Sequence, residues 1–173
     1  MKKVILLFFI GLIILNIKTT KAGIVEIPNE AIRLRVIANS NSNYDQQVKM
    51  KVKDNLENTI YDILKDTTNV DEARKLINNN MYKINNSIKD ILVSEKYNLD
   101  YDINFGKNYF PEKEYNGILY QEGYYESVLV TLGNGEGDNW WCVLFPPLCL
   151  LEAEESDEVE YKFFVQELID KYF

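Results

Sequence analysis

Residues 31–38 read Ala-Ile-Arg-Leu-Arg-Val-Ile-Ala, and this alternation is the clearest structural pattern in the chain. The apolar residues at even positions share one face, whereas Arg33 and Arg35 share the other. A period of two predicts a half-buried β-strand. Residues 39–43, Asn-Ser-Asn-Ser-Asn, are turn formers, so we expect them to end the strand and to cap a helix that follows.

Two helices are predicted after this strand. Apolar residues recur at helical spacing across residues 44–65, and Ser42 followed by Asp45 is typical of a capping box. A second helix is expected to begin at Asn69 and to continue to about Glu95. Their connection is short, so the two helices should pack antiparallel. Three cations of the first helix are interpreted as a solvated face: Lys49, Lys51 and Lys53.

The second half of the chain is dominated by strand patterns. A period of two begins at Leu99 and predicts a strand that meets a turn or bulge at residues 106–108. Strand character returns in residues 112–120, where it is weaker, and in residues 125–132 and 140–145. A last helix is predicted near the C-terminus. Helices segregated from a mainly antiparallel sheet indicate an α+β domain, with two antiparallel helices packed on the sheet and a C-terminal helix added.

The composition limits the chemistry that this chain can perform. Its 173 residues suit one domain, and 46% hydrophobic with 27% charged residues excludes a disordered chain. A net charge of −8 argues against nucleic-acid binding. The chain has no histidine and only two cysteines, which excludes a Ser-His-Asp or Cys-His pair and a histidine-ligated or all-cysteine zinc site. No cofactor or metal is expected.

The N-terminus has the pattern of an export signal. Lys2 and Lys3 precede twelve apolar residues, 4–15, and Ala22 offers a small residue for cleavage. The run is short for a spanning helix, which needs ~20 apolar residues. We therefore interpret residues 1–22 as a signal peptide or an N-terminal anchor, with a buried core helix as the alternative.

The chain is accordingly divided into three parts: a signal peptide or anchor (1–22), an α+β domain (23–151), and an acidic link with the C-terminal helix (152–173). Loss of the first part would remove four lysines and no acids, so the net charge would change from −8 to −12. Such acidity favours solubility and disfavours adsorption to anionic membranes.

Residues 133–149, Gly-Asn-Gly-Glu-Gly-Asp-Asn-Trp-Trp-Cys-Val-Leu-Phe-Pro-Pro-Leu-Cys, have an unusual composition. A phosphate-binding loop is disfavoured, because Glu136 and Asp138 would repel the anion. These two carboxylates suggest a hard cation such as calcium, but the usual ligand series is absent. Cys142 lacks a histidine to activate it as a nucleophile. The remaining alternatives are a structural role and a surface that binds a partner.

Adjacent tryptophans on an extended segment point to opposite faces, so one should fill the core and the other should lie on the surface as an interaction anchor. The candidate partner-binding residues are Gly133, Gly135, Glu136, Gly137, Asp138, Asn139, Trp140 and Trp141. In an exported protein, Cys142 and Cys149 are candidate disulfide partners, with buried reduced thiols as the alternative.

Four stretches resemble the stage II sporulation protein R family of endospore-forming bacteria. They are Arg-Leu-Arg-Val-Ile-Ala-Asn-Ser-Asn-Ser (33–42), Asp-Gln-Gln (45–47), Gly-Tyr-Tyr-Glu (123–126) and the long motif of residues 135–149. The chain departs from the family pattern at Gln121-Glu122, where Pro-Ala is usual, and at Asn41, where Asp is common.

The resemblance implies a function. Proteins of this family are made in the forespore and exported into the space between the forespore and mother-cell membranes. There they trigger a membrane-embedded aspartic protease that removes the pro-segment from the precursor of sigma factor E. By this resemblance the chain is a ligand of that protease and not an enzyme.

Two rival functions remain. An exported cell-wall hydrolase would need two carboxylates at a fixed distance, for which Glu126 and Glu136 can be nominated. A glycan-binding module would use an exposed tryptophan. The sequence leaves the choice to the structure and to experiment.

Overall fold

A computed structural model describes residues 27–115, 118–148 and 158–173. The elements in chain order are β1 (Ile32–Ile37), α2 (Asn43–Leu64), α3 (Val70–Asn79), α4 (Met81–Ser94), β2 (Tyr101–Phe110), β3 (Lys113–Tyr115), β4 (Ile118–Tyr120), β5 (Gly123–Leu132), β6 (Asn139–Phe145) and α5 (Glu158–Tyr172). The predicted signal peptide or anchor (1–22) and the first part of the predicted acidic link (residues 152–157) lie outside the described residues. No described helix is long and apolar enough to cross a bilayer.

Four strands form one mixed sheet in the order β2-β5-β1-β6. β1 runs parallel to β5 and antiparallel to β6, and β2 runs antiparallel to β5. β3 and β4 form a separate hairpin. Two of the three pairings in the main sheet are antiparallel, so the α+β prediction with a mainly antiparallel sheet is confirmed. The first strand in the sequence is an inner strand of the sheet.

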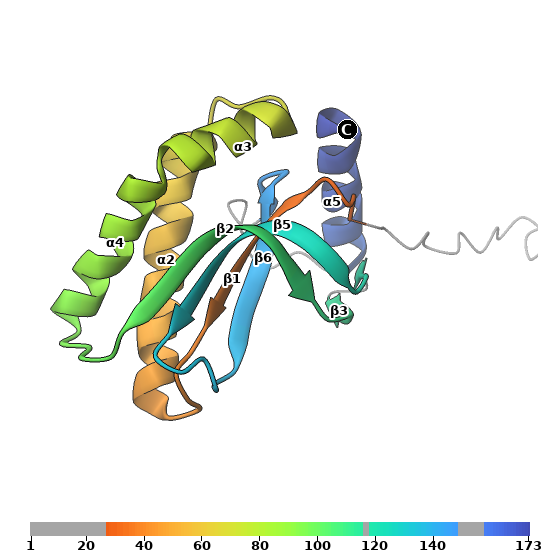
Figure 1. The fold of residues 1–173 in the computed structure, drawn as a ribbon. Coiled ribbons are helices and arrows are strands. Elements are labelled where there is room, and N and C mark those ends of the chain that lie inside the picture. The colour runs from red at the N-terminus through yellow and green to blue at the C-terminus, as the bar shows by residue number, and fades with distance from the viewer. Residues whose placement is uncertain (1–26, 116–117, 149–157) are drawn as a thin grey trace, which may run out of the picture.

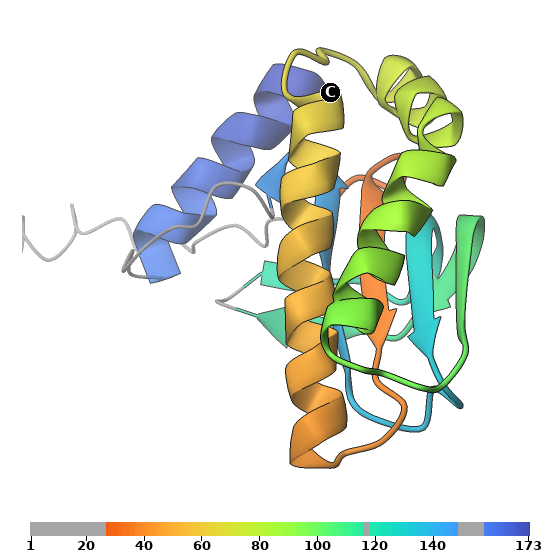
Figure 2. The same ribbon diagram turned by 90° about the vertical axis from the view of Figure 1, so that its left-hand side faces the viewer.

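The helices α2, α3 and α4 cover one face of the sheet, with α2 and α4 side by side and antiparallel (Figures 1 and 2). Leu34 of β1, Val52 of α2 and Ile88 of α4 belong to the core cluster between these layers. A second cluster lies on the other face, where the β3–β4 hairpin and α5 contribute Ile118, Tyr120 and Val165. The sheet therefore separates two apolar layers of unequal size.

Both predicted helix starts are confirmed. The hydroxyl of Ser42 accepts a hydrogen bond from the backbone N–H of Asp45 at 3.1 Å, and the side chain of Asn69 accepts from that of Glu72 at 2.9 Å. Each satisfies a donor that the first helical turn would leave unpaired.

The predicted helix from Asn69 to Glu95 is wrong in one respect, because it is broken at Asn80. The backbone of Asn80 leaves the helical region (φ −109°, ψ 10°), and its side-chain amide donates to the carbonyl of Leu76 at 2.8 Å. A short polar side chain that bonds its own backbone competes with the helix, which explains the break between α3 and α4.

The turn or bulge predicted at residues 106–108 is also absent, since β2 continues in regular register to Phe110. Asn108 lies within the strand, where its amide donates to the hydroxyl of Ser127 at 2.9 Å on the neighbouring strand. This bond between strands lets a turn-forming residue remain in an extended segment.

Candidate functional site

Two family motifs that are distant in the sequence meet at one end of the sheet. Residues 39–45 leave the carboxyl end of β1, and the loop of residues 133–138 leaves the carboxyl end of β5. Because β1 and β5 are parallel neighbours, both segments emerge at the same edge. We call this meeting point, formed by residues 39–49 and 133–138, the polar junction.

Asparagine side chains of the first segment hold the backbone of the second. The Asn39 amide oxygen accepts from the N–H of Asn134 at 3.0 Å, and the Asn41 amide oxygen accepts from the N–H of Asp138 at 2.6 Å. The N–H of Glu136 donates to the Asn39 carbonyl at 3.1 Å. The loop is thus held through hydrogen bonds to its backbone, as a strand is held in a sheet. Some of the acceptors, however, are asparagine side chains in place of backbone carbonyls.

Asp45 supports the asparagine that holds the loop. Its carboxylate accepts from the hydroxyl of Ser40 at 2.5 Å and from the amide of Asn39 at 3.0 Å. These hydrogen bonds, with that of Ser40 the largest cause, hold the pKa of Asp45 below its ordinary value of 3.8. An ionised Asp45 therefore fixes the orientation of Asn39.

Lys49 corrects the prediction that the lysines of α2 form a solvated face. It is only 5% exposed, and its ammonium donates to the side-chain oxygen of Gln46 at 2.5 Å and to the carbonyl of Asp138 at 3.2 Å. Burial lowers the pKa of Lys49, whereas the charge of Asp138 raises it. Lys51 does lie exposed, paired with Glu95 at 2.7 Å.

The glycines of the loop are required by geometry, as Gly133 and Gly137 illustrate. Gly133 has a φ of +55°, in the left-handed region that side chains disfavour. At Gly137 a Cβ atom would overlap the backbone carbonyl of Ser40. The close approach of the two segments therefore depends on a missing side chain.

The two tryptophans point to opposite faces, as predicted. Trp140 packs against the helix-side core, with the ammonium of Lys53 4.9 Å from its ring centroid. Trp141 packs in the second cluster, edge-on to Tyr120 at 5.1 Å and to Phe110 at 5.6 Å. Both are half-buried, so the expectation that one would fill the core and the other would lie on the surface is corrected.

The exposed part of the loop is acidic. The side chains of Asn134, Glu136 and Asp138 are exposed, and Asn139 is half-buried at the start of β6. In the described ranges no three His, Cys, Asp or Glu side chains gather at one point. The loop therefore exposes negatively charged side chains, whereas the residues that hold it in place form hydrogen bonds within the protein.

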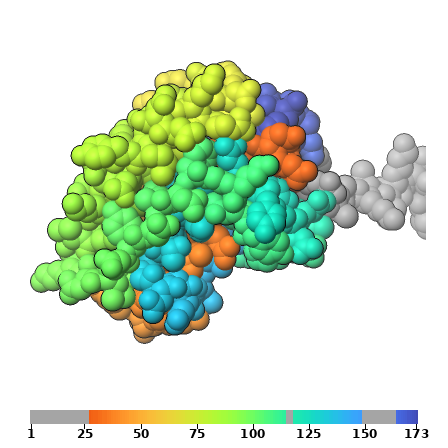
Figure 3. Space-filling view, viewed as in Figure 1, coloured from red at the N-terminus to blue at the C-terminus, as the bar shows by residue number. Residues whose placement is uncertain are grey.

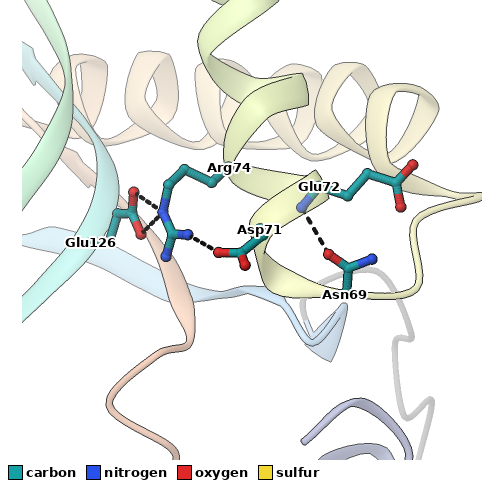
Figure 4. A network of polar contacts seen from close by, with 5 residues as sticks. All are labelled: Asn69, Asp71, Glu72, Arg74 and Glu126. Atoms are coloured by element: carbon teal, nitrogen blue, oxygen red, sulfur yellow. Dashed lines mark hydrogen bonds and ion pairs between the residues drawn. The ribbon is translucent and has the colours of Figure 1, made fainter.

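The carboxylates nominated for a hydrolase are far apart. Glu126 and the end of β5 are separated by six residues of strand, about 20 Å, whereas glycosidase carboxylates lie roughly 5–9.5 Å apart. Glu126 is also engaged: the Nε of Arg74 donates to both its oxygens at 2.8 Å, and Arg74 in turn pairs with Asp71 (Figure 4). This pair joins α3 to the sheet.

Cys142 lies on β6 beside Leu34 of β1. Cys149 lies outside the described residues, so the Cys142–Cys149 disulfide stays a prediction. The assignment of residues 133–141 to partner binding likewise stays a prediction. What the structure adds is that side chains of the other segment hold the loop backbone at Asn134 and Asp138.

Comparisons with known proteins show the family of this chain. Residues 28–155 match the family described as stage II sporulation protein R. The stage II sporulation protein R of Bacillus subtilis (strain 168) is 43% identical over 136 residues, which cover 79% of this chain and 61% of that protein. This chain therefore spans less than two thirds of the relative's length. No solved structure matches it. Because the family model matches well over half of its residues, the chain belongs to the stage II sporulation protein R family, which connects it with sporulation.

Proposed function

We propose that this chain is an exported signalling protein of sporulation that activates a membrane-embedded aspartic protease, the enzyme that processes the precursor of sigma factor E. The observation that supports a binding role most directly is the polar junction. The side chains of Asn39 and Asn41 hold the backbone of its loop, and the side chains that the loop itself carries at Glu136 and Asp138 are exposed. Such preorganisation favours recognition, because less ordering is needed on binding.

The protein activates the protease by shifting the equilibrium between the inactive and active forms of that enzyme. Residues 1–22 direct it from the forespore into the space between the two membranes, where it meets the outward-facing part of the protease. A ligand changes the balance between inactive and active protease only by binding the active form more tightly. The rigid loop of residues 133–138 and the neighbouring Asn139 supply that differential contact.

Reconstitution tests the proposal. The full chain is expressed together with the protease and the sigma precursor in a bacterium that lacks all three, and shortening of the precursor is followed on blots. Processing should require both the chain and the protease. Processing that proceeds equally without this chain would refute the activating role.

Single substitutions then test the loop. Asp138→Asn, Asn139→Ala and Trp140→Phe should reduce processing while thermal unfolding stays near that of the parent, and Glu72→Gln, on the exposed surface of α3, serves as the matched control. If every inactive variant also unfolds, these residues hold the fold only, and the contact surface lies elsewhere.

The rival functions have distinct outcomes in the same preparations. Release of sugar fragments from purified cell wall by this chain alone would favour a hydrolase. A saturable change in tryptophan fluorescence on addition of wall glycans would favour a glycan-binding module, because Trp140 and Trp141 are half-buried and report on their surroundings.

A further inference from the structure

The chain has three arginines, and only one of them has an acidic partner among the described residues. Arg74 pairs with Asp71 and Glu126. The other two, Arg33 and Arg35, lie two residues apart on β1, so their side chains project from the same face of the sheet. In a chain with 27 acidic residues, two adjacent cations without an acid are unexpected.

Arg33 is fully buried in an aromatic cage. Its guanidinium carbon lies 3.4 Å from the ring centroid of Tyr125, 5.2 Å from that of Phe110 and 5.6 Å from that of Trp141. Within the described part of the chain, none of its three side-chain nitrogens has a hydrogen-bond partner. Ring faces compensate part of the loss of water, but they accept no hydrogen bond along the guanidinium edge.

Arg35 lies next to this cage and is half-buried. One terminal nitrogen donates to the carbonyl of Tyr109 at 3.1 Å, and the guanidinium carbon is 5.8 Å from the Phe110 ring centroid. Its Nε is buried and has no acceptor in the described ranges. Burial, as the largest cause, lowers the pKa of both arginines, and at Arg33 the neighbouring phenols of Tyr125 and Tyr120 oppose that shift in part. The guanidinium groups of both arginines thus lie near the same ring, that of Phe110.

The face from which Arg35 projects is covered only in part. The β3–β4 hairpin and α5 pack over the end that holds Arg33, and no described helix packs over the other end, where Ile37, Leu129 and Thr131 are half-buried and Asn104 is exposed. Figure 3 shows orange atoms of the β1 region at the surface, beside the green of β2 and the blue of β6. A partner can therefore reach Arg35 from outside.

We propose that Arg35, with Arg33 behind it, binds a carboxylate that an acidic side chain of a partner protein presents to this open face of the sheet. The planar guanidinium matches a carboxylate through two parallel hydrogen bonds. The net charge of −8 disfavours surfaces rich in phosphate, which carry many negative charges, more than a single carboxylate. That the partner is the protease rests on the proposed function; that the site takes a carboxylate does not.

The three arginines make the test direct. In the full chain, nitrogen-15 spectra of the arginine Nε–H groups should give three signals, assigned with Arg35→Lys and Arg74→Lys. Glutarate is titrated at constant ionic strength, with sodium chloride and inorganic phosphate as parallel arms. We expect a saturable shift of the Arg35 signal with glutarate, little change with chloride, and a stationary Arg74 signal, because its carboxylate partners are already in place.

No shift of Arg35, an equal shift of Arg74, or a stronger response to phosphate than to glutarate would overturn the carboxylate site. In the processing assay, Arg35→Gln should need about tenfold more protein for the same effect, the loss expected for one charge-assisted pair, and Arg35→Lys should lie between it and the parent. Lys83→Gln, exposed on α4, is the control. If the parent chain fails to activate the protease, the proposed function fails, and the spectra still decide the carboxylate site.

Discussion

Lys49 of α2 donates a hydrogen bond to the backbone carbonyl of Asp138, 89 residues later in the sequence, at 3.2 Å. This contact fastens the loop between β5 and β6 to the helix layer. It also places a buried ammonium next to the exposed residue Asp138, so the position of Asp138 is set by α2 as well as by the sheet.

Replacing Lys49 with Met should lower the free energy of unfolding by ~1–3 kcal/mol, because the Asp138 carbonyl and the Gln46 side chain lose a charged donor. Chemical denaturation measures the change. Lys51→Met is the matched control, since its exposed ion pair with Glu95 should contribute no more than ~1 kcal/mol. Equal effects of the two substitutions would show that the buried contact has no special role.

Gly137→Ala should destabilise the protein by ~1–3 kcal/mol, because the new methyl group meets the backbone of Ser40, which cannot rotate away. Gly106→Ala provides the contrast: its Cβ would have open space, the nearest atom lying 4.0 Å away. It should be neutral or slightly stabilising, by up to ~1 kcal/mol. Thermal unfolding of both variants checks the difference, and a stable Gly137→Ala protein would contradict the close approach at the junction.

The low pKa of Asp45 makes the junction sensitive to acid. A carboxylate whose pKa is lower in the folded than in the unfolded state stabilises the fold above the ordinary value, 3.8, and this contribution is lost as the pH falls through the folded value. Asp45→Asn should therefore be less stable than the parent at pH 7, and the gap should narrow below pH 3.8. Urea unfolding at a series of pH values measures the gap, with Asp90→Asn on the surface of α4 as control. A gap that is constant with pH would be inconsistent with an ionised Asp45 in the network.

Tyr97 makes the stability of the fold depend on pH at the alkaline end of the range. Burial, as the largest cause, raises its pKa from 10.0 to about 12, so folding favours the neutral phenol. Its contribution is complete below pH 10 and is lost as the pH rises toward 12. Tyr97→Phe should be as stable as the parent at pH 7, since the hydroxyl has no hydrogen-bond partner among the described residues, and should lose less stability between these values. Tyr82→Phe, 79% exposed, should follow the parent; identical curves for all three would refute the shift.

Local patterns predicted the elements well where local physics decides them. The alternation around β1, the helical spacing in α2 and the caps at Ser42 and Asn69 depend on neighbours within four residues, and all were confirmed. The break at Asn80 and the extended Asn108 were missed, because each depends on a side-chain bond that competes with the average preference of the residue.

The candidate site was harder to predict, because its supports come from the other half of the chain. Lys49 was placed in solvent with its neighbours, yet it lies in one helical stripe with Asp45 and the buried Val52, Leu56 and Ile60. This helical register is the pattern from which the burial of Lys49 could have been predicted. No sequence pattern predicts the burial of Arg33, because that burial depends on a hairpin that packs over the second face of the sheet, and the alternation of β1 does not reveal the hairpin.

The position of β1 between β5 and β6 has a consequence for biosynthesis. A ribosome releases β1 early, but neither neighbour of this strand exists until residues 127–145 have been made. Closing such long loops is slow, and it comes late. For most of its time as a nascent polypeptide, the protein must therefore lack the middle of its sheet, and a chain in that state can still be threaded through a narrow channel.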